Sequence, residues 1–105
     1  MLRIYEVILE VIRELRPFVR ELERVDASLA DQMRRALPSV ALNTAEGSGS
    51  RGRTRGVRYS TACGSAKETM SCIDCGVVMY DLEMPDVSTI EKLRHVIGAL
   101  TILSR

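Results

Sequence analysis

The stretch that decides the fold runs from residue 32 to residue 68. Residues 32–47 read QMRRALPSVALNTAEG, residues 48–59 read SGSRGRTRGVRY and residues 60–68 read STACGSAKE. The outer two pieces carry apolar residues three and four apart, which is typical of helices. The middle piece and its edge are punctuated by Gly47, Gly49, Gly52 and Gly56, and each glycine lowers helix propensity by about 1 kcal/mol relative to alanine. The sequence therefore predicts two helices joined by a short, basic, flexible connector.

Upstream of this stretch, the sequence predicts a first helix from Leu2 to Val25. Its apolar seam is formed by Tyr5, Ile8, Ile12, Leu15, Val19 and Leu22, and a second apolar row by Ile4, Val11, Phe18 and Val25. Two rows make a wider apolar face than one neighbouring helix covers, so we expect self-association. Pro17 cannot donate a backbone hydrogen bond, and we expect it to kink or split the helix.

The same logic places three more helices. The second is expected to start near Ser28, with Ser28 and Asp31 as a capping box, and to bend at Pro38. The third resumes near residues 54–57 and carries the clearest heptad, and a capping box formed by Ser88 and Glu91 starts the fourth. The seam of the third helix is Tyr59, Cys63, Ala66, Met70, Ile73, Val77 and Tyr80. The prediction is an all-α, antiparallel up-down four-helix bundle, with residues 1–105 as a single domain.

Charge is distributed unevenly along the chain. The net charge is only +1, yet residues 34–58 contain six arginines against Glu46 alone. A local excess of positive charge in a near-neutral protein indicates a defined contact with an anion. The three cysteines form an odd set without a secretory context, which favours a reducing cytoplasm. Charged residues interrupt every apolar run, so neither a signal sequence nor a membrane span is expected.

Residues 32–68 resemble a known family. The pattern consists of Gln32, Arg34, Arg35, Ala36, Ser39, Asn43, Ala45, Glu46 and Gly47, then Gly49, Arg51, Ala62, Gly64, Ser65 and Glu68. It resembles the small four-helix bundle proteins encoded within intervening sequences of bacterial 23S rRNA genes. Those proteins are similar in turn to the accessory variability protein of diversity-generating retroelements. The resemblance implies a closed ring, commonly a homopentamer, with basic surfaces for RNA or DNA, a reverse transcriptase partner in the retroelement branch, and no catalytic activity.

Two functional hypotheses follow for the arginines. In the first, the chain is a non-enzymatic accessory protein that contacts nucleic acid through Arg34, Arg35, Arg51, Arg53, Arg55 and Arg58. Arginine suits this role because its guanidinium binds phosphate, and glycines let backbone N–H groups approach. In the alternative, the protein is a structural or protein-partner scaffold whose arginines make salt bridges between subunits. Arg34 and Arg35 diverge by about 100° on a helix, so only one of them can face a given target.

Two polar pairs flank the basic segment. Asn43 with Glu46, and Ser65 with Glu68, are each spaced three residues apart, which places both members on one side of a helix. We interpret the four residues as a polar clasp between the second and third helices or between subunits. A small polar binding site is the other interpretation. The clasp is favoured because unpaired buried polar groups cost about 1 to 3 kcal/mol each.

Several enzymatic and cofactor motifs are excluded. Gly47, Gly49 and Gly52 match a dinucleotide fingerprint in spacing, but that motif requires a preceding strand. Cys72 and Cys75 lack the further ligands that zinc requires. His95 follows Glu91 by four residues, whereas di-iron bundles use a spacing of three. We therefore expect no catalytic residues, no metal and no cofactor.

Overall fold

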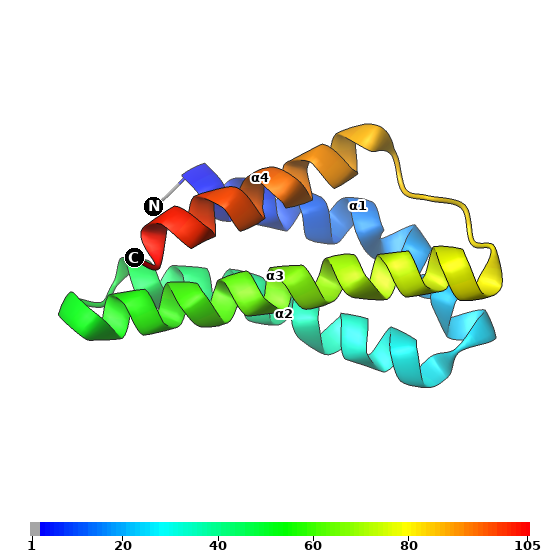
Figure 1. Ribbon diagram of the computed structural model, residues 1–105, viewed down its shortest axis with the longest axis horizontal. Helices are drawn as coiled ribbons and strands as arrows, with labels where there is room; N and C mark the ends of the chain where they lie inside the picture. The colour runs from blue at the N-terminus through cyan, green and yellow to red at the C-terminus, as the bar shows by residue number, and fades with distance from the viewer. Residues whose placement is uncertain (1–2) are drawn as a thin grey trace.

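The computed structural model describes residues 3–105 and contains four helices in that range (Figure 1). They are α1 (Arg3–Val25), α2 (Ala27–Ser48), α3 (Gly52–Tyr80) and α4 (Val87–Leu103), and the described residues contain no strand. The helices run antiparallel along an elongated body of 43 × 25 × 18 Å. Each of α1 and α3 packs against both α2 and α4. The prediction of an all-α four-helix bundle is confirmed.

The core is drawn from all four helices. Its largest fully buried apolar side chains are Leu15, Leu22, Met33, Ile73, Leu93, Leu100 and Val96. The second apolar row of α1 is largely in this core too, because Ile4, Val11 and Phe18 are buried and only Val25 is exposed. Since α1 packs against two helices, it needs a wide apolar face within one chain. The width of this face therefore does not require a second subunit.

Neither proline divides its helix. The helices α1 and α2 continue through Pro17 and Pro38. Both prolines are exposed, so water can satisfy the backbone carbonyl that each one leaves without a partner. Of the two outcomes expected at Pro17, a kink or a split, the split does not occur.

The helix starts also differ from the predicted capping boxes. The α2 helix begins earlier than Ser28, at Ala27, because Asp26 is its N-cap and accepts a hydrogen bond from the backbone N–H of Leu29 at 2.9 Å. The other carboxylate oxygen of Asp26 accepts a hydrogen bond from the hydroxyl of Tyr80 at 2.6 Å. The α4 helix likewise begins at Val87, so Ser88 lies inside it. Asp26 therefore caps α2 and also binds α3.

Close packing joins α2 to α3 just below their shared turn. A methyl group added to Gly47 would lie 2.7 Å from Cε1 of Tyr59, a buried side chain. Only glycine lets the Tyr59 ring lie against the α2 backbone at this position. This contact fixes the base of the segment that carries the arginines.

Candidate nucleic-acid interface

The turn between α2 and α3 is much shorter than the connector that the glycines predict. Only residues 49–51 lie outside the two helices. The backbone N–H of Gly49 donates to the carbonyl of Glu46 at 3.2 Å, and the hydroxyl of Ser50 donates to the same carbonyl at 2.7 Å. Gly52 takes a positive φ of 59°, a conformation that glycine adopts without strain. The expected flexible connector is therefore a tight turn, and Gly47, Gly52 and Gly56 lie within the bounds of α2 or α3.

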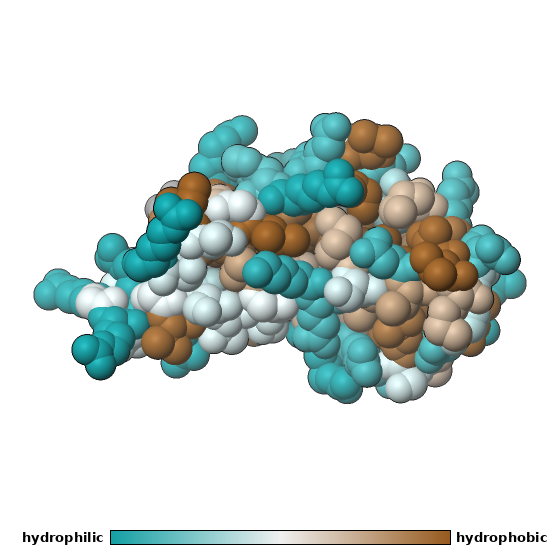
Figure 2. All heavy atoms as spheres, in the orientation of Figure 1, coloured by the Kyte–Doolittle hydropathy of each residue, from teal (hydrophilic) through white to brown (hydrophobic). Residues whose placement is uncertain are grey.

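The arginines of this segment lie at the start of α3. Arg51 is the N-cap residue, and Arg53, Arg55 and Arg58 lie in the first two turns of the helix. We call these four residues the arginine tip. All four are exposed, and Figure 2 shows hydrophilic side chains projecting from this end of the molecule. Because successive helical residues are rotated by about 100°, Arg53 and Arg55 point about 160° apart. The arginine tip thus spreads positive charge around the helix end.

Most of this charge is not neutralised within the chain. Arg58 forms a loose, exposed ion pair with Glu46 at 3.6 Å, and Nε of Arg55 donates to the carbonyl of Ser50 at 3.2 Å. Among the described residues, Arg51 and Arg53 form no ion pair. The first turn of α3 has no acidic residue, and Arg51 makes no side-chain capping bond. The positive end of the helix dipole therefore adds to the arginine charge.

Arg34 and Arg35 do not join the arginine tip. They lie in the first half of α2, about 20 Å along the helix from its end at Ser48. Arg34 forms ion pairs with Glu23 of α1 and, at 2.9 Å, with Asp31. These carboxylates, Glu23 above all, raise the pKa of Arg34. The length of α2 therefore separates Arg34 and Arg35 from the connector arginines with which they were predicted to act.

Sequence reasoning missed Arg105. The carbonyl of Ser104 would lie 3.3 Å from a Cβ added to Gly56, so the end of α4 lies beside the start of α3. Figure 1 shows the end of α4 near the turn between α2 and α3. The up-down topology could have predicted this, since antiparallel order brings the end of α4 to the start of α3. Arg105 is exposed and adds a further arginine to this end of the bundle.

Only two of the four residues of the predicted polar clasp, Asn43 and Ser65, lie together in the structure. The hydroxyls of Ser39 and Ser65 lie 2.7 Å apart, and Nδ2 of Asn43 donates to the Ser39 hydroxyl at 3.1 Å. These three residues join the middle of α2 to the middle of α3. Glu46 instead pairs with Arg58, and Glu68 is exposed on α3. Ser39 was not included in the expected clasp, although it lies one turn before Asn43 on the same face.

Comparison with protein-family models, curated proteins and solved structures finds no match to this chain. The resemblance described above therefore depends on the residues quoted for it.

The remaining chemistry is modest. No group of three or more His, Cys, Asp or Glu side chains within residues 3–105 is arranged to hold a metal ion. Burial raises the pKa of the Cys72 thiol to about 11, which keeps it protonated at neutral pH and unreactive. Cys63 is buried and its thiol lies 3.4 Å from the hydroxyl of Thr101. Across the described part of the chain, no helix is sufficiently long and apolar to cross a bilayer.

Proposed function

We propose that this chain is a non-enzymatic accessory protein that binds RNA or DNA through its arginine tip. The observation that carries the proposal is the set of exposed arginines at the N-terminus of α3, of which only Arg58 has an ion-pair partner among the described residues. Arginines and unsatisfied backbone N–H groups at a helix start both favour phosphate oxygens. A polyanion bound there would neutralise charges that the chain leaves unpaired.

The expected recognition is of the phosphate backbone. The four arginines of the tip diverge around the helix end, and the tip contains no aromatic side chain that is exposed for base stacking, because Tyr59 is buried. Phosphate contacts position a protein on nucleic acid but do not read its sequence. We therefore expect weak sequence preference and strong dependence on salt. Four phosphate contacts correspond to a slope of about −3.6 for log K against log salt on duplex DNA.

The proposal includes assembly into a ring of identical subunits in the cytoplasm. Its support is the family resemblance, which implies a ring that is commonly a homopentamer and a reverse transcriptase partner in one branch. A ring would present several arginine tips to one nucleic acid, and linked weak sites bind far more tightly than single ones.

A protein-partner scaffold is the second candidate. It is favoured by exposed apolar side chains near the end opposite the arginine tip, where Val78 is 79% exposed, Val87 is 73% exposed and Met79 is 68% exposed. Such side chains are enriched where proteins meet other proteins. A partner recovered by pull-down after nuclease treatment, and lost on Val78→Asp with Met79→Asp, would favour this function.

Fluorescence anisotropy with labelled RNA hairpins and DNA duplexes tests the nucleic-acid proposal. We expect Arg51→Ala with Arg53→Ala to weaken binding of both by about tenfold or more, since each charge-assisted contact contributes roughly 1 kcal/mol or more. The matched control is Arg24→Ala with Arg94→Ala, which removes the same charge from α1 and α4. Equal losses in the two variants would show that only net charge matters and would remove the arginine tip as the site.

A further inference from the structure

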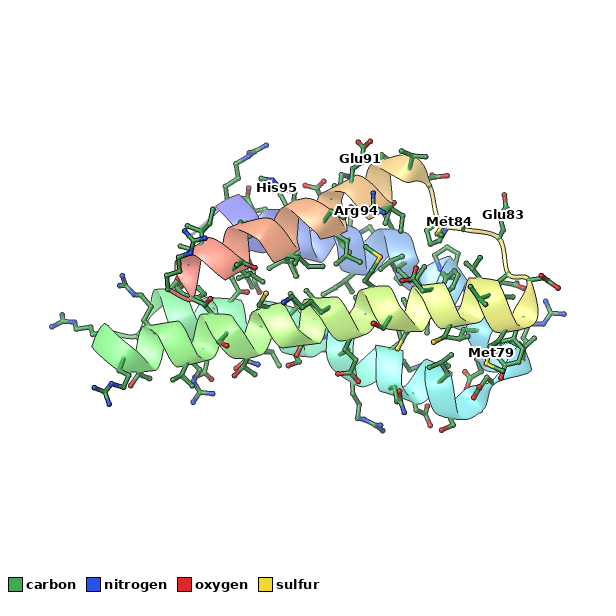
Figure 3. The ribbon with its side chains drawn as sticks, in the orientation of Figure 1. Met79, Glu83, Met84, Glu91, Arg94 and His95 are labelled. Atoms are coloured by element: carbon green, nitrogen blue, oxygen red, sulfur yellow. The ribbon has the colours of Figure 1, made fainter. Side chains whose placement is uncertain are left out.

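Two grooves lie beside α1, and the first is lined in part by acidic side chains. This acidic groove has a volume of about 730 Å³ and lies between α1 and the loop joining α3 to α4. Its lining includes the apolar residues Phe18, Leu82 and Met84 and the acidic residues Glu21, Glu83 and Asp86. Figure 3 shows Glu83 and Met84 on that loop, with Glu83 pointing away from the bundle. The acidic groove thus combines an apolar surface with negative charge.

The second groove has the opposite charge. This basic groove has a volume of about 270 Å³ and lies between α1 and α2. It is lined by Ile12, Val19 and Leu37 and by Arg16, Arg20 and Arg34. An apolar surface edged by charge is the usual anatomy of a protein–protein contact.

The two grooves lie at the same level of the bundle. The acidic groove touches α1 between Glu14 and Glu21, and the basic groove touches it between Ile12 and Arg20. The midpoints of these segments differ by about 2 Å along the helix axis. Glu14 faces α4, where it accepts hydrogen bonds from Thr89 and Lys92, both at 2.6 Å. Arg16 lies about 160° away around the helix. The outer surface of α1 therefore lies between the basic groove on one side and the acidic groove on the other.

The charges best placed to attract a partner are unpaired. Within the described residues, Arg16 and Arg20 form no ion pair, and neither do Glu83 and Asp86. By contrast, Arg34 and Glu14 are already bonded within the chain. The basic groove thus offers two free positive charges, and the acidic groove of the same molecule offers two free negative charges.

We propose that the acidic groove of one copy binds the basic groove of the next copy, with the two bundles parallel. This inference rests on the self-association proposed above and assigns its interface. The contact joins two different surfaces, so repeating it yields a closed ring or, if the rotation does not close, a filament. Parallel copies place every arginine tip on the same side of the assembly. Apolar linings bury against each other, and ion pairs between Arg16, Arg20 and Glu83 fix the orientation.

Sedimentation velocity without nucleic acid tests the pairing. The wild-type chain is expected to assemble at low salt and to dissociate at high salt. Arg16→Glu with Arg20→Glu, and separately Glu83→Arg with Asp86→Arg, should each give monomers. In an equal mixture of the two variants, the intact grooves pair opposite charges and so do the two altered grooves, so the mixture should assemble with the two variants alternating. The fourfold variant restores opposite charges with their signs exchanged and should assemble again.

The control separates assembly from nucleic-acid binding. Arg53→Glu with Arg55→Glu changes the net charge as much as the basic-groove variant but should leave assembly intact. Circular dichroism confirms that each variant is folded. A wild-type chain that stays monomeric at all salt concentrations would overturn both this inference and the proposed ring, while leaving binding at the arginine tip testable by anisotropy. Assembly that persists in both groove variants, or a folded fourfold variant that stays monomeric, would overturn the groove pairing alone.

Discussion

The two ends of the bundle use their polar residues in different ways. At the far end from the arginine tip, long-range hydrogen bonds tie the helices together: Tyr80 of α3 donates to Asp26 at 2.6 Å, and Thr89 of α4 donates to Glu14 of α1 at 2.6 Å. At the arginine tip, the hydrogen bond is local, from Nε of Arg55 to the carbonyl of Ser50 at 3.2 Å. The far end therefore uses its charged residues to join helices, whereas the arginine tip leaves most of its charge available to a ligand.

The largest expected effect concerns the base of the arginine tip. Gly47→Ala should destabilise the fold by about 1 to 3 kcal/mol, because the new methyl group overlaps the buried Tyr59 ring. The added Cβ would lie 2.7 Å from Cε1 of Tyr59. Chemical denaturation measures the loss. Gly64→Ala is the matched control, since a Cβ there meets nothing within 4 Å, and it should add up to about 1 kcal/mol of stability. Equal effects in the two variants would contradict the close α2–α3 contact.

The second prediction concerns the opposite end. Asp26→Ala should lower the melting temperature by roughly 4 to 8 °C, because it removes both the cap of α2 and the acceptor for Tyr80. Asp26→Asn keeps one acceptor oxygen, which can still cap the backbone N–H of Leu29, and should lose less. If Asp26→Ala melts like the wild type, the polar groups of this end do not hold the fold.

The pH dependence sharpens the same contrast. The hydrogen bond from Tyr80, followed by that from Leu29, lowers the pKa of Asp26 below its ordinary value of 3.8. Hydrogen bonds from Lys92 and Thr89 lower the pKa of Glu14 below 4.5. A carboxyl group with a depressed pKa binds protons more readily when unfolded, so its contribution is complete above the unfolded pKa and is lost as the pH falls through the folded value. Thermal melts should therefore show stability falling below about pH 4.5, and less steeply in Asp26→Asn. Parallel pH profiles for the two proteins would contradict this role.

The smallest expected effect comes from Arg35. It is exposed in α2, about 20 Å along the helix from the arginine tip. Arg35→Ala should change stability by less than about 0.5 kcal/mol and nucleic-acid binding by no more than the Arg94→Ala change does. A loss of binding affinity as large as that caused by Arg53→Ala would show that Arg35 also contacts the nucleic acid.

The bundle could be predicted from the sequence because its apolar periodicity is regular. The whole predicted seam of α3 is buried or half-buried, from Tyr59 to Tyr80. The same helix also buries Ala62, Thr69 and Gly76, which hydropathy alone did not single out. Small residues are buried there because α3 packs against both α2 and α4.

The arrangement at the arginine tip was harder to predict. Local propensity treats each glycine as a helix breaker, but packing of Tyr59 against Gly47 and of Gly56 beside Ser104 outweighs that cost. The connector is therefore mostly helical. The separation of Arg34 and Arg35 from the arginine tip, and the approach of Arg105 to it, depend on distances in three dimensions. Neither of these distances could be predicted from how close the residues are in the sequence.

The central claim is that the unpaired arginines of the tip bind nucleic-acid phosphates. Its most direct test is the salt dependence of binding to duplex DNA for the wild type and for variants that remove Arg51, Arg53 and Arg55 one after another. The account predicts that the slope of log K against log salt becomes shallower by about 1 with each arginine removed. A slope that does not change across the series would contradict it.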